Sequence, residues 1–138
     1  MFLHPRRYYK VVQGSGSYQL VFESRPRYLY AHLRAEYIDL DVAISYVNEL
    51  VGHLRSTEHT RLLLVRDTPT IISRRQYSII GNMIINTLPA AVRFAMIDHS
   101  PSRPVVASVM IEEAKAKHRE ARVFQTFGDG EAWLLSEG

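Results

Sequence analysis

Residues 62–65, Leu-Leu-Leu-Val, form a continuous apolar run between Arg61 and Arg66, and this run decides the fold. A strand with one face in water alternates apolar and polar residues, whereas a run that is apolar throughout is typical of a central parallel strand covered on both faces. Parallel neighbours need a long crossover connection, which is usually a helix. The run therefore predicts an α/β protein with helices before and after it.

Both flanking segments have the period of an amphipathic helix. Upstream, Asp39 is the expected N-cap, and a second helix is expected downstream from about Ser73 to Leu88, where Pro89 ends it. The residues expected to face inward in the first helix are Leu40, Ala43, Ile44, Val47, Leu50, Val51 and Leu54. Those expected to face inward in the second are Tyr77, Ile80, Met83, Ile84 and Leu88.

The alternation of strand and helix continues towards the C-terminus. Residues 92–97 predict the next buried strand, and a third helix is expected to begin at Ser102 or its neighbour, with Pro104 in its first turn. Residues 123–124 predict a short strand, and Asp129 is the expected cap of a terminal helix.

The N-terminal part has strand composition. Residues 8–12 and 18–23 are separated by the sequence Gly14-Ser15-Gly16-Ser17, which favours a hairpin turn, and residues 27–36 predict a further strand. We expect the hairpin to be antiparallel and to lie at an edge of the sheet. The whole pattern predicts an α/β fold with a mostly parallel sheet of five to six strands, an N-terminal antiparallel hairpin and four helices.

Composition limits the classes of protein to which the chain can belong. With 138 residues, 46% of them apolar and 22% charged, the chain can bury a core, and we expect one domain over residues 1–138, with the N-terminal strand and hairpin turn in residues 1–17. The absence of cysteine excludes disulfides and a cysteine nucleophile. Because no apolar run approaches the ~20 residues that cross a bilayer and no signal peptide precedes the strands, we expect a cytoplasmic protein without membrane insertion.

Positive charge is concentrated near the N-terminus. Residues 1–37 hold six Lys and Arg against two Glu, although the whole chain has a net charge of only +3. These basic residues alternate with apolar ones in strand-like segments, so we expect them on the solvated face of a sheet rather than on a nucleic-acid surface.

Several of these segments together resemble the SpoIIAA-like, or STAS-like, family, a branch that is also related to lipid-binding SEC14-like domains. The resemblance spans roughly residues 18–136 and rests on residues 28–33, the link 35–39, the strand 62–67, and the closing Arg122-Val123-Phe124 and Glu131-Ala132-Trp133-Leu134. Trp133, with its large apolar area, is expected to anchor the last helix to the sheet.

The resemblance implies a SpoIIAA-like βα superhelix and a non-enzymatic regulatory module that binds a protein partner such as a kinase or a sensory complex. Anti-sigma-factor antagonists of this family are phosphorylated on a serine at the start of the second helix, and Ser73, six residues after Asp67, occupies the matching position. The flanking Ile72, Arg74 and Arg75 differ from the acidic and small residues of the phosphorylated members.

The loop and helix that begin near Asp67 are the expected interaction site, because ligands of open α/β sheets bind beyond the carboxyl ends of the strands. Its candidate residues for interaction or phosphorylation are Asp67, Thr70, Ser73, Arg74 and Arg75. The sequence Ser73-Arg74-Arg75-Gln76 also has the form of a capping box, which explains a serine there without phosphorylation. A phosphate on Ser73 would in turn meet the positive end of the helix and two arginines.

No constellation in the sequence favours catalysis, a metal or a cofactor. Asp98, His99, Ser100 and Ser102 are close in sequence, but no nucleophile elbow accompanies them, and adjacent loop residues rarely orient one another as base and nucleophile. The histidines lack metal-ligand spacing; they are His4, His32, His53, His59, His99 and His118. We expect a protein that is not an enzyme.

The second predicted helix is more apolar than one stripe requires, since Ile79 and Ile85 accompany its inward-facing residues. One explanation for this composition is deep burial. The other is an exposed apolar surface that docks a partner or accepts a lipid chain. If Ile79 and Met83 are exposed, a homodimer across this helix is favoured. The alternative function is a carrier or sensor of a small apolar ligand or lipid.

Overall fold

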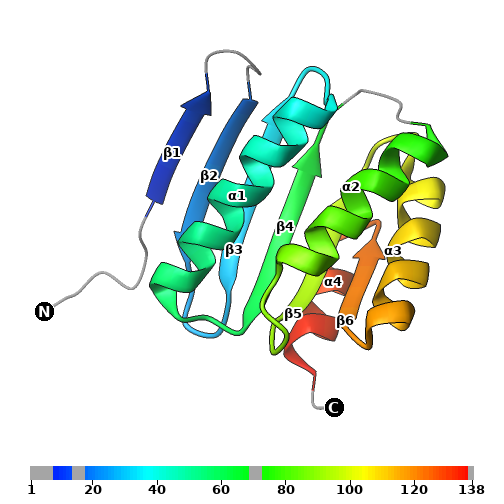
Figure 1. The fold of residues 1–138 in the computed structure, drawn as a ribbon. Helices are drawn as coiled ribbons and strands as arrows, with labels where there is room; N and C mark the ends of the chain where they lie inside the picture. Colours follow the sequence, from blue (N-terminus) through cyan, green and yellow to red (C-terminus); the bar gives the residue numbers. More distant parts are fainter. Residues whose placement is uncertain (1–7, 14–17, 69–72, 137–138) are drawn as a thin grey trace, which may run out of the picture.

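The computed structural model describes residues 8–13, 18–68 and 73–136. In these residues, six strands form one sheet and four helices cover it (Figure 1). The strands are β1 (Tyr8–Gln13), β2 (Tyr18–Ser24), β3 (Leu29–Ala35), β4 (Arg61–Asp67), β5 (Arg93–Asp98) and β6 (Glu120–Phe124). The helices are α1 (Leu40–Thr57), α2 (Arg74–Thr87), α3 (Arg103–Lys117) and α4 (Phe127–Leu135).

The strands follow one another across the sheet in chain order, β1 to β6. β1 pairs antiparallel with β2, and β2 antiparallel with β3, while β3, β4, β5 and β6 are parallel neighbours. The expected edge hairpin and mostly parallel sheet are therefore confirmed, although the antiparallel part has one strand more than the hairpin alone. The expected turn at residues 14–17 lies outside the described residues.

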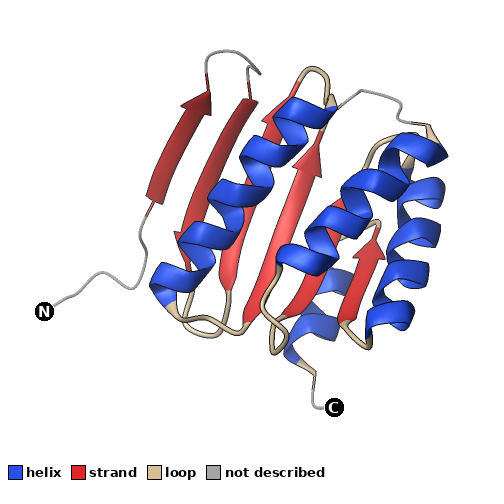
Figure 2. Cartoon of the chain, in the orientation of Figure 1, coloured by secondary structure: helices blue, strands red, loops and turns tan. Residues whose placement is uncertain are grey.

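The helices lie on opposite faces of the sheet in unequal number. Figures 1 and 2 show α1, α2 and α3 in front of the sheet and α4 behind it. Leu62 and Leu64 point into the larger core under the three front helices, whereas Leu63 points into a smaller core shared with Leu134 of α4. Burial on both faces is the reason why β4 is apolar along its centre.

The inner face of α1 is rotated relative to the predicted stripe. Leu40 and Ile44 were expected to point inward, but they are 47% and 40% exposed, while Val42 and Tyr46 are buried. The helix leans on the antiparallel strands, where the ring of Tyr46 meets Tyr18 edge-on at 6.4 Å between centroids. This contact turns Leu40 and Ile44 outward, towards α2 and solvent.

The start of α4 also differs from the prediction. Asp129 was expected to cap this helix, but the N-cap is Thr126, whose Oγ1 accepts a hydrogen bond from the Asp129 backbone N–H at 3.2 Å. The helix begins earlier than the sequence suggested because Phe127 belongs to its first turn and packs against the smaller core. Trp133 packs there too, with its ring centroid 5.6 Å from that of Phe124, as expected of an anchor between helix and sheet.

Arg25 is half-buried, whereas Arg27 and Arg34 are exposed, as expected of the N-terminal basic residues. Nε of Arg25 donates to Glu23 and its Nη1 to the hydroxyl of Tyr28, both at 2.6 Å, and Tyr28 in turn donates to Glu131 of α4 at 2.6 Å. Burial and the hydrogen bond to Glu131 raise the pKa of Tyr28 to about 12. The end of β2 is thereby connected to α4.

The close approach of α4 to β5 yields a stability test. A Cβ added at Gly130 would lie 2.3 Å from Cδ1 of the buried Ile97 and 3.3 Å from Phe124, so we expect Gly130→Ala to lower the free energy of unfolding by about 1–3 kcal/mol. A Cβ at Gly52 of α1 meets nothing within 4 Å, so Gly52→Ala should raise stability by about 0.5–1 kcal/mol. Urea denaturation of both variants measures the difference, and equal effects would contradict this packing.

Candidate interaction site

The predicted site residues lie where β4 ends and α2 begins. Asp67 is the last residue of β4, is half-exposed, and has its Oδ2 3.6 Å from Nε2 of His32. Ser73, Arg74 and Arg75 are exposed at the start of α2. Thr70 lies outside the described residues. The described candidates thus lie together beyond the carboxyl end of β4, which is where open α/β sheets bind their ligands.

Ser73 forms the predicted capping box. Its Oγ accepts the backbone N–H of Gln76 at 3.2 Å, while its own N–H donates to Gln76 Oε1 at 3.4 Å. These bonds satisfy backbone donors that the first helical turn would otherwise leave unpaired. The hydroxyl of Ser73 is therefore exposed and already has a structural use.

The two arginines that follow Ser73 have different surroundings. Arg74 turns towards α3, where its Nη2 lies 2.9 Å from Glu112 and its Nη1 donates to Ser108 at 3.2 Å. This exposed pair contributes little stability, but it directs Arg74 away from α1. Arg75 is exposed on the outer side of α2, next to Gln76.

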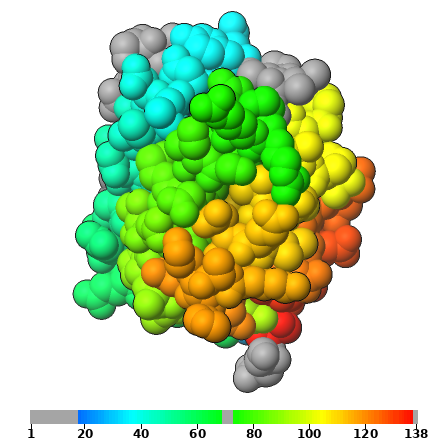
Figure 3. All heavy atoms as spheres, turned by 45° about the vertical axis from the view of Figure 1, so that its right-hand side comes forward, coloured from blue at the N-terminus to red at the C-terminus, as the bar shows by residue number. Residues whose placement is uncertain are grey.

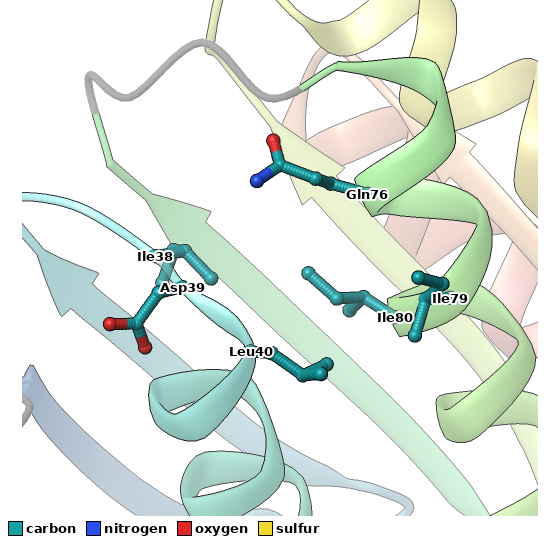
Figure 4. A pocket seen from close by; sticks show the side chains of 6 residues that line it. All are labelled: Ile38, Asp39, Leu40, Gln76, Ile79 and Ile80. Carbon is teal, nitrogen blue, oxygen red and sulfur yellow. The ribbon is translucent and has the colours of Figure 1, made fainter.

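A groove of about 180 Å³ lies between the start of α1 and α2 (Figure 4). Leu40 and Ile80 point towards each other across it, and the full set of lining residues is Ile38, Asp39, Leu40, Gln76, Ile79 and Ile80. We refer to these six residues as the α1–α2 groove. Because Gln76 belongs both to the groove and to the capping box, the groove is joined directly to Ser73.

Exposed apolar side chains gather around this groove. Of the five large hydrophobic residues that are exposed in the described part of the chain, Leu40 and Ile79 line the groove, Tyr37 precedes the lining residue Ile38 in the chain, and Ile44 lies one helical turn after Leu40. Ile79 is 49% exposed, whereas Ile80, Ile84 and Ile85 are buried in the core and Met83 is half-buried. Burial therefore accounts for most of the apolar character of α2, and Ile79 is its exposed apolar residue among those predicted.

A buried ion pair, which no sequence pattern indicated, joins the carboxyl-terminal ends of β4 and β5. Nη1 of Arg66 on β4 lies 2.9 Å from Oδ2 of Asp98 on β5, and both side chains have no exposed surface. Among the described residues, Nε and Nη2 of Arg66 have no hydrogen-bond partner. Burial raises the pKa values of the neighbouring Tyr46 and Tyr77, so both hydroxyls stay neutral beside the pair.

Asp98 also orders the start of α3. Its Oδ1 accepts the backbone N–H of Ser100 at 2.7 Å, and Ser100 Oγ accepts the N–H of Ser102 at 3.2 Å. Asp98 was expected in a polar loop, but it is the last residue of β5 and is fully buried because Arg66 neutralises it there. Its carboxylate is committed to Arg66 and to the loop backbone.

The described part of the chain comprises residues 8–13, 18–68 and 73–136. This part of the chain holds no group of three or more His, Asp or Glu that could bind a metal ion. None of its helices has the length and apolar character needed to cross a membrane.

Compared with known proteins, the sequence matches no family model, and no curated protein matches it significantly. The resemblance to the SpoIIAA-like family therefore stays a prediction from the residues quoted for it. Function must be argued from the geometry of this site.

The buried pair makes a prediction about stability. Asp98→Ala leaves the Arg66 guanidinium buried without a counter-charge, so we expect a loss of about 3–5 kcal/mol in the free energy of unfolding. The double variant Arg66→Met/Asp98→Ala removes the orphaned charge and should recover most of that loss. Urea denaturation compares the two, and a double variant less stable than Asp98→Ala alone would contradict the interpretation.

The capping box makes a second prediction. Ser73→Ala removes the acceptor for the Gln76 N–H and should lower the free energy of unfolding by about 1 kcal/mol. Ser73→Asp keeps a capping acceptor and adds negative charge at the helix N-terminus, so it should retain wild-type stability. Equal losses in both variants, measured by urea denaturation, would mean that the cap contributes nothing.

Proposed function

We propose that this protein is a non-enzymatic regulatory module that binds a partner protein through the α1–α2 groove. The observation that carries the proposal is the concentration of exposed apolar residues around this groove, since contiguous exposed apolar surface usually marks an interaction site. Leu40 on α1 and Ile79 on α2 both line the groove, and Ile44 lies one helical turn after Leu40.

The arrangement of the parallel strands supports a SpoIIAA-like βα superhelix. β3, β4, β5 and β6 are adjacent in chain order, and the helices that connect them all lie on the same face of the sheet (Figure 1). A chain that returns on the same face after each strand winds in one direction. This support is independent of the sequence resemblance.

The groove suits a single apolar side chain presented by a partner. Its volume of about 180 Å³ is below the ~300 Å³ at which small-molecule pockets begin. Asp39 borders it on the α1 side, and the exposed Arg75 precedes Gln76 on the α2 side. An apolar anchor between polar flanks is the usual composition of a protein interface.

Ser73 is well positioned to regulate such binding. A phosphate there would bring negative charge to the N-terminal end of α2, where it is favourable, and would compete for the backbone N–H groups that the capping box now uses. Gln76 would lose its present partner and change its position in the groove. Phosphorylation by a partner kinase would thus alter the surface that the partner protein contacts.

The alternative function, a carrier of an apolar ligand or lipid, receives less support. Ile80, Ile84 and Ile85 belong to the core, which accounts for most of the apolar character of α2. The α1–α2 groove is also too small for a drug-sized ligand.

The test compares two variants that introduce the same charge at exposed positions. Ile79, in the groove, is 49% exposed, whereas Ser56 is exposed near the C-terminal end of α1 and does not line the groove. Capture from a lysate of the source organism, quantified by mass spectrometry, should give partners that are retained by wild type and Ser56→Asp but reduced about tenfold or more by Ile79→Asp, because truncated interface anchors cost ~2 kcal/mol or more.

Sedimentation velocity on the same proteins separates a partner protein from a second copy of the chain. If wild type is a dimer and Ile79→Asp dissociates it, the groove binds a second copy of the chain and not a partner protein. If Ile79→Asp and wild type capture the same proteins and have the same mass in solution, the groove is not an interaction site.

A further inference from the structure

A second surface lies at the other end of the sheet, along the free edge of β6. Among the described strands, β6 pairs only with β5, so one row of its backbone groups faces away from the sheet. An open groove of about 350 Å³ follows this edge, and we refer to it as the β6 groove. Its lining residues come from α3, from the link between α3 and β6, from β6 and from α4: Ile111, Ala114, Lys115, Arg119, Glu120, Ala121, Arg122 and Trp133.

The groove reaches both faces of the sheet. Ala121 belongs to the core under α3, whereas Arg122 is turned to the opposite face, where its guanidinium lies 5.7 Å from the ring of Trp133. On the α3 side, Ile111 is 46% exposed. In a strand added to β6, successive side chains would point alternately to the face with Ile111 and to the face with Trp133. Both faces of the added strand would therefore make apolar contacts.

The charge of the groove is positive. Its lining holds Lys115, Arg119 and Arg122 but only one carboxylate, that of Glu120. The Glu120 carboxylate lies 3.7 Å from Nε of Arg93, so it is engaged within the molecule. The side chain of Arg93 also lies over Trp133, with its guanidinium 4.2 Å from the ring. An incoming segment therefore meets cations and aromatic surface.

A second copy of the chain is a poor occupant of this edge. In an antiparallel pair of β6 strands that pair over their full length about a two-fold axis, Arg122, the central residue of β6, would face its own symmetry mate. Like charges directly opposite each other destabilise a strand pair. The same position favours a foreign strand that places a carboxylate opposite Arg122.

We propose that β6 is a docking edge that binds an extended segment of a partner protein, one in which acidic residues alternate with apolar ones. Main-chain hydrogen bonds to β6 would supply affinity, while Arg122 and the Ile111 and Trp133 surfaces would select the sequence. This interaction is separate from the α1–α2 groove, because α3 and α4, not α1, form its walls.

The sole tryptophan of the chain reports on the proposed site. We expect a short capped peptide of alternating valine and glutamate to change the fluorescence of Trp133 saturably and to slow hydrogen exchange at the backbone amides of β6. Arg122→Glu should weaken this binding on the order of tenfold. Arg75→Glu, an equal charge change on α2, should leave it within about twofold of wild type, because Arg75 does not line the β6 groove and salt screens exposed charges at a distance.

Three results would overturn the proposal. The first is no saturable change with the valine and glutamate peptide. The second is equal binding of a peptide with lysine in place of glutamate, or equal weakening by Arg122→Glu and Arg75→Glu. The third is self-association of the chain that Arg122→Glu changes and Ile79→Asp leaves unchanged, which would assign the edge to a second copy. None of these results depends on whether Ile79 binds a partner.

Discussion

The pairing of Arg66 with Asp98 constrains the centre of the molecule. Two charges without exposed surface sit at the end of an otherwise apolar layer, held 2.9 Å apart by the alignment of β4 with β5. Burying such a pair contributes little net stability, because the loss of hydration offsets most of the attraction. Its effect is on specificity: a shift of β4 by one residue would turn Arg66 to the other face and leave Asp98 without its counter-charge.

That constraint positions the segments on which both proposed surfaces depend. β4 precedes α2 and its capping box in the chain. Asp98 accepts a hydrogen bond from the backbone N–H of Ser100 and so fixes the link that leads from β5 into α3. α2 supplies one wall of the α1–α2 groove, and α3 supplies one wall of the β6 groove. The two surfaces therefore share a framework while they lie on different elements, and α2 and α3, which each supply a wall, are side by side on the face shown in Figure 3.

The order of strands and helices could be predicted because each segment carries its own local pattern. The capping box at Ser73 could also be predicted, since both partners lie within one helical turn. The exposure of Leu40 and Ile44 could not, because the apolar stripe of α1 is wider than the face that α1 buries against the sheet. Nor could the Arg66 and Asp98 pair, whose members are 32 residues apart and meet only through strand register.

The β6 groove illustrates a further limit of local patterns. Ile111, Arg122 and Trp133 each have an ordinary role within their own element, as a helix residue, a strand residue and an anchor. They form one surface only because α3 and α4 take opposite faces at the same edge. Sequence periodicity describes each helix or strand separately, so it does not predict a surface that several elements form together.

The hydrogen bond between Tyr28 and Glu131 joins residues 103 positions apart. During synthesis on a ribosome, the sheet can gather its three front helices before this bond exists, because they precede α4 in the chain. Until α4 emerges, the apolar side chains of Leu63, Ala95 and Ile97 on that face of the sheet are exposed to solvent. A nascent chain paused there would be a natural client for chaperones.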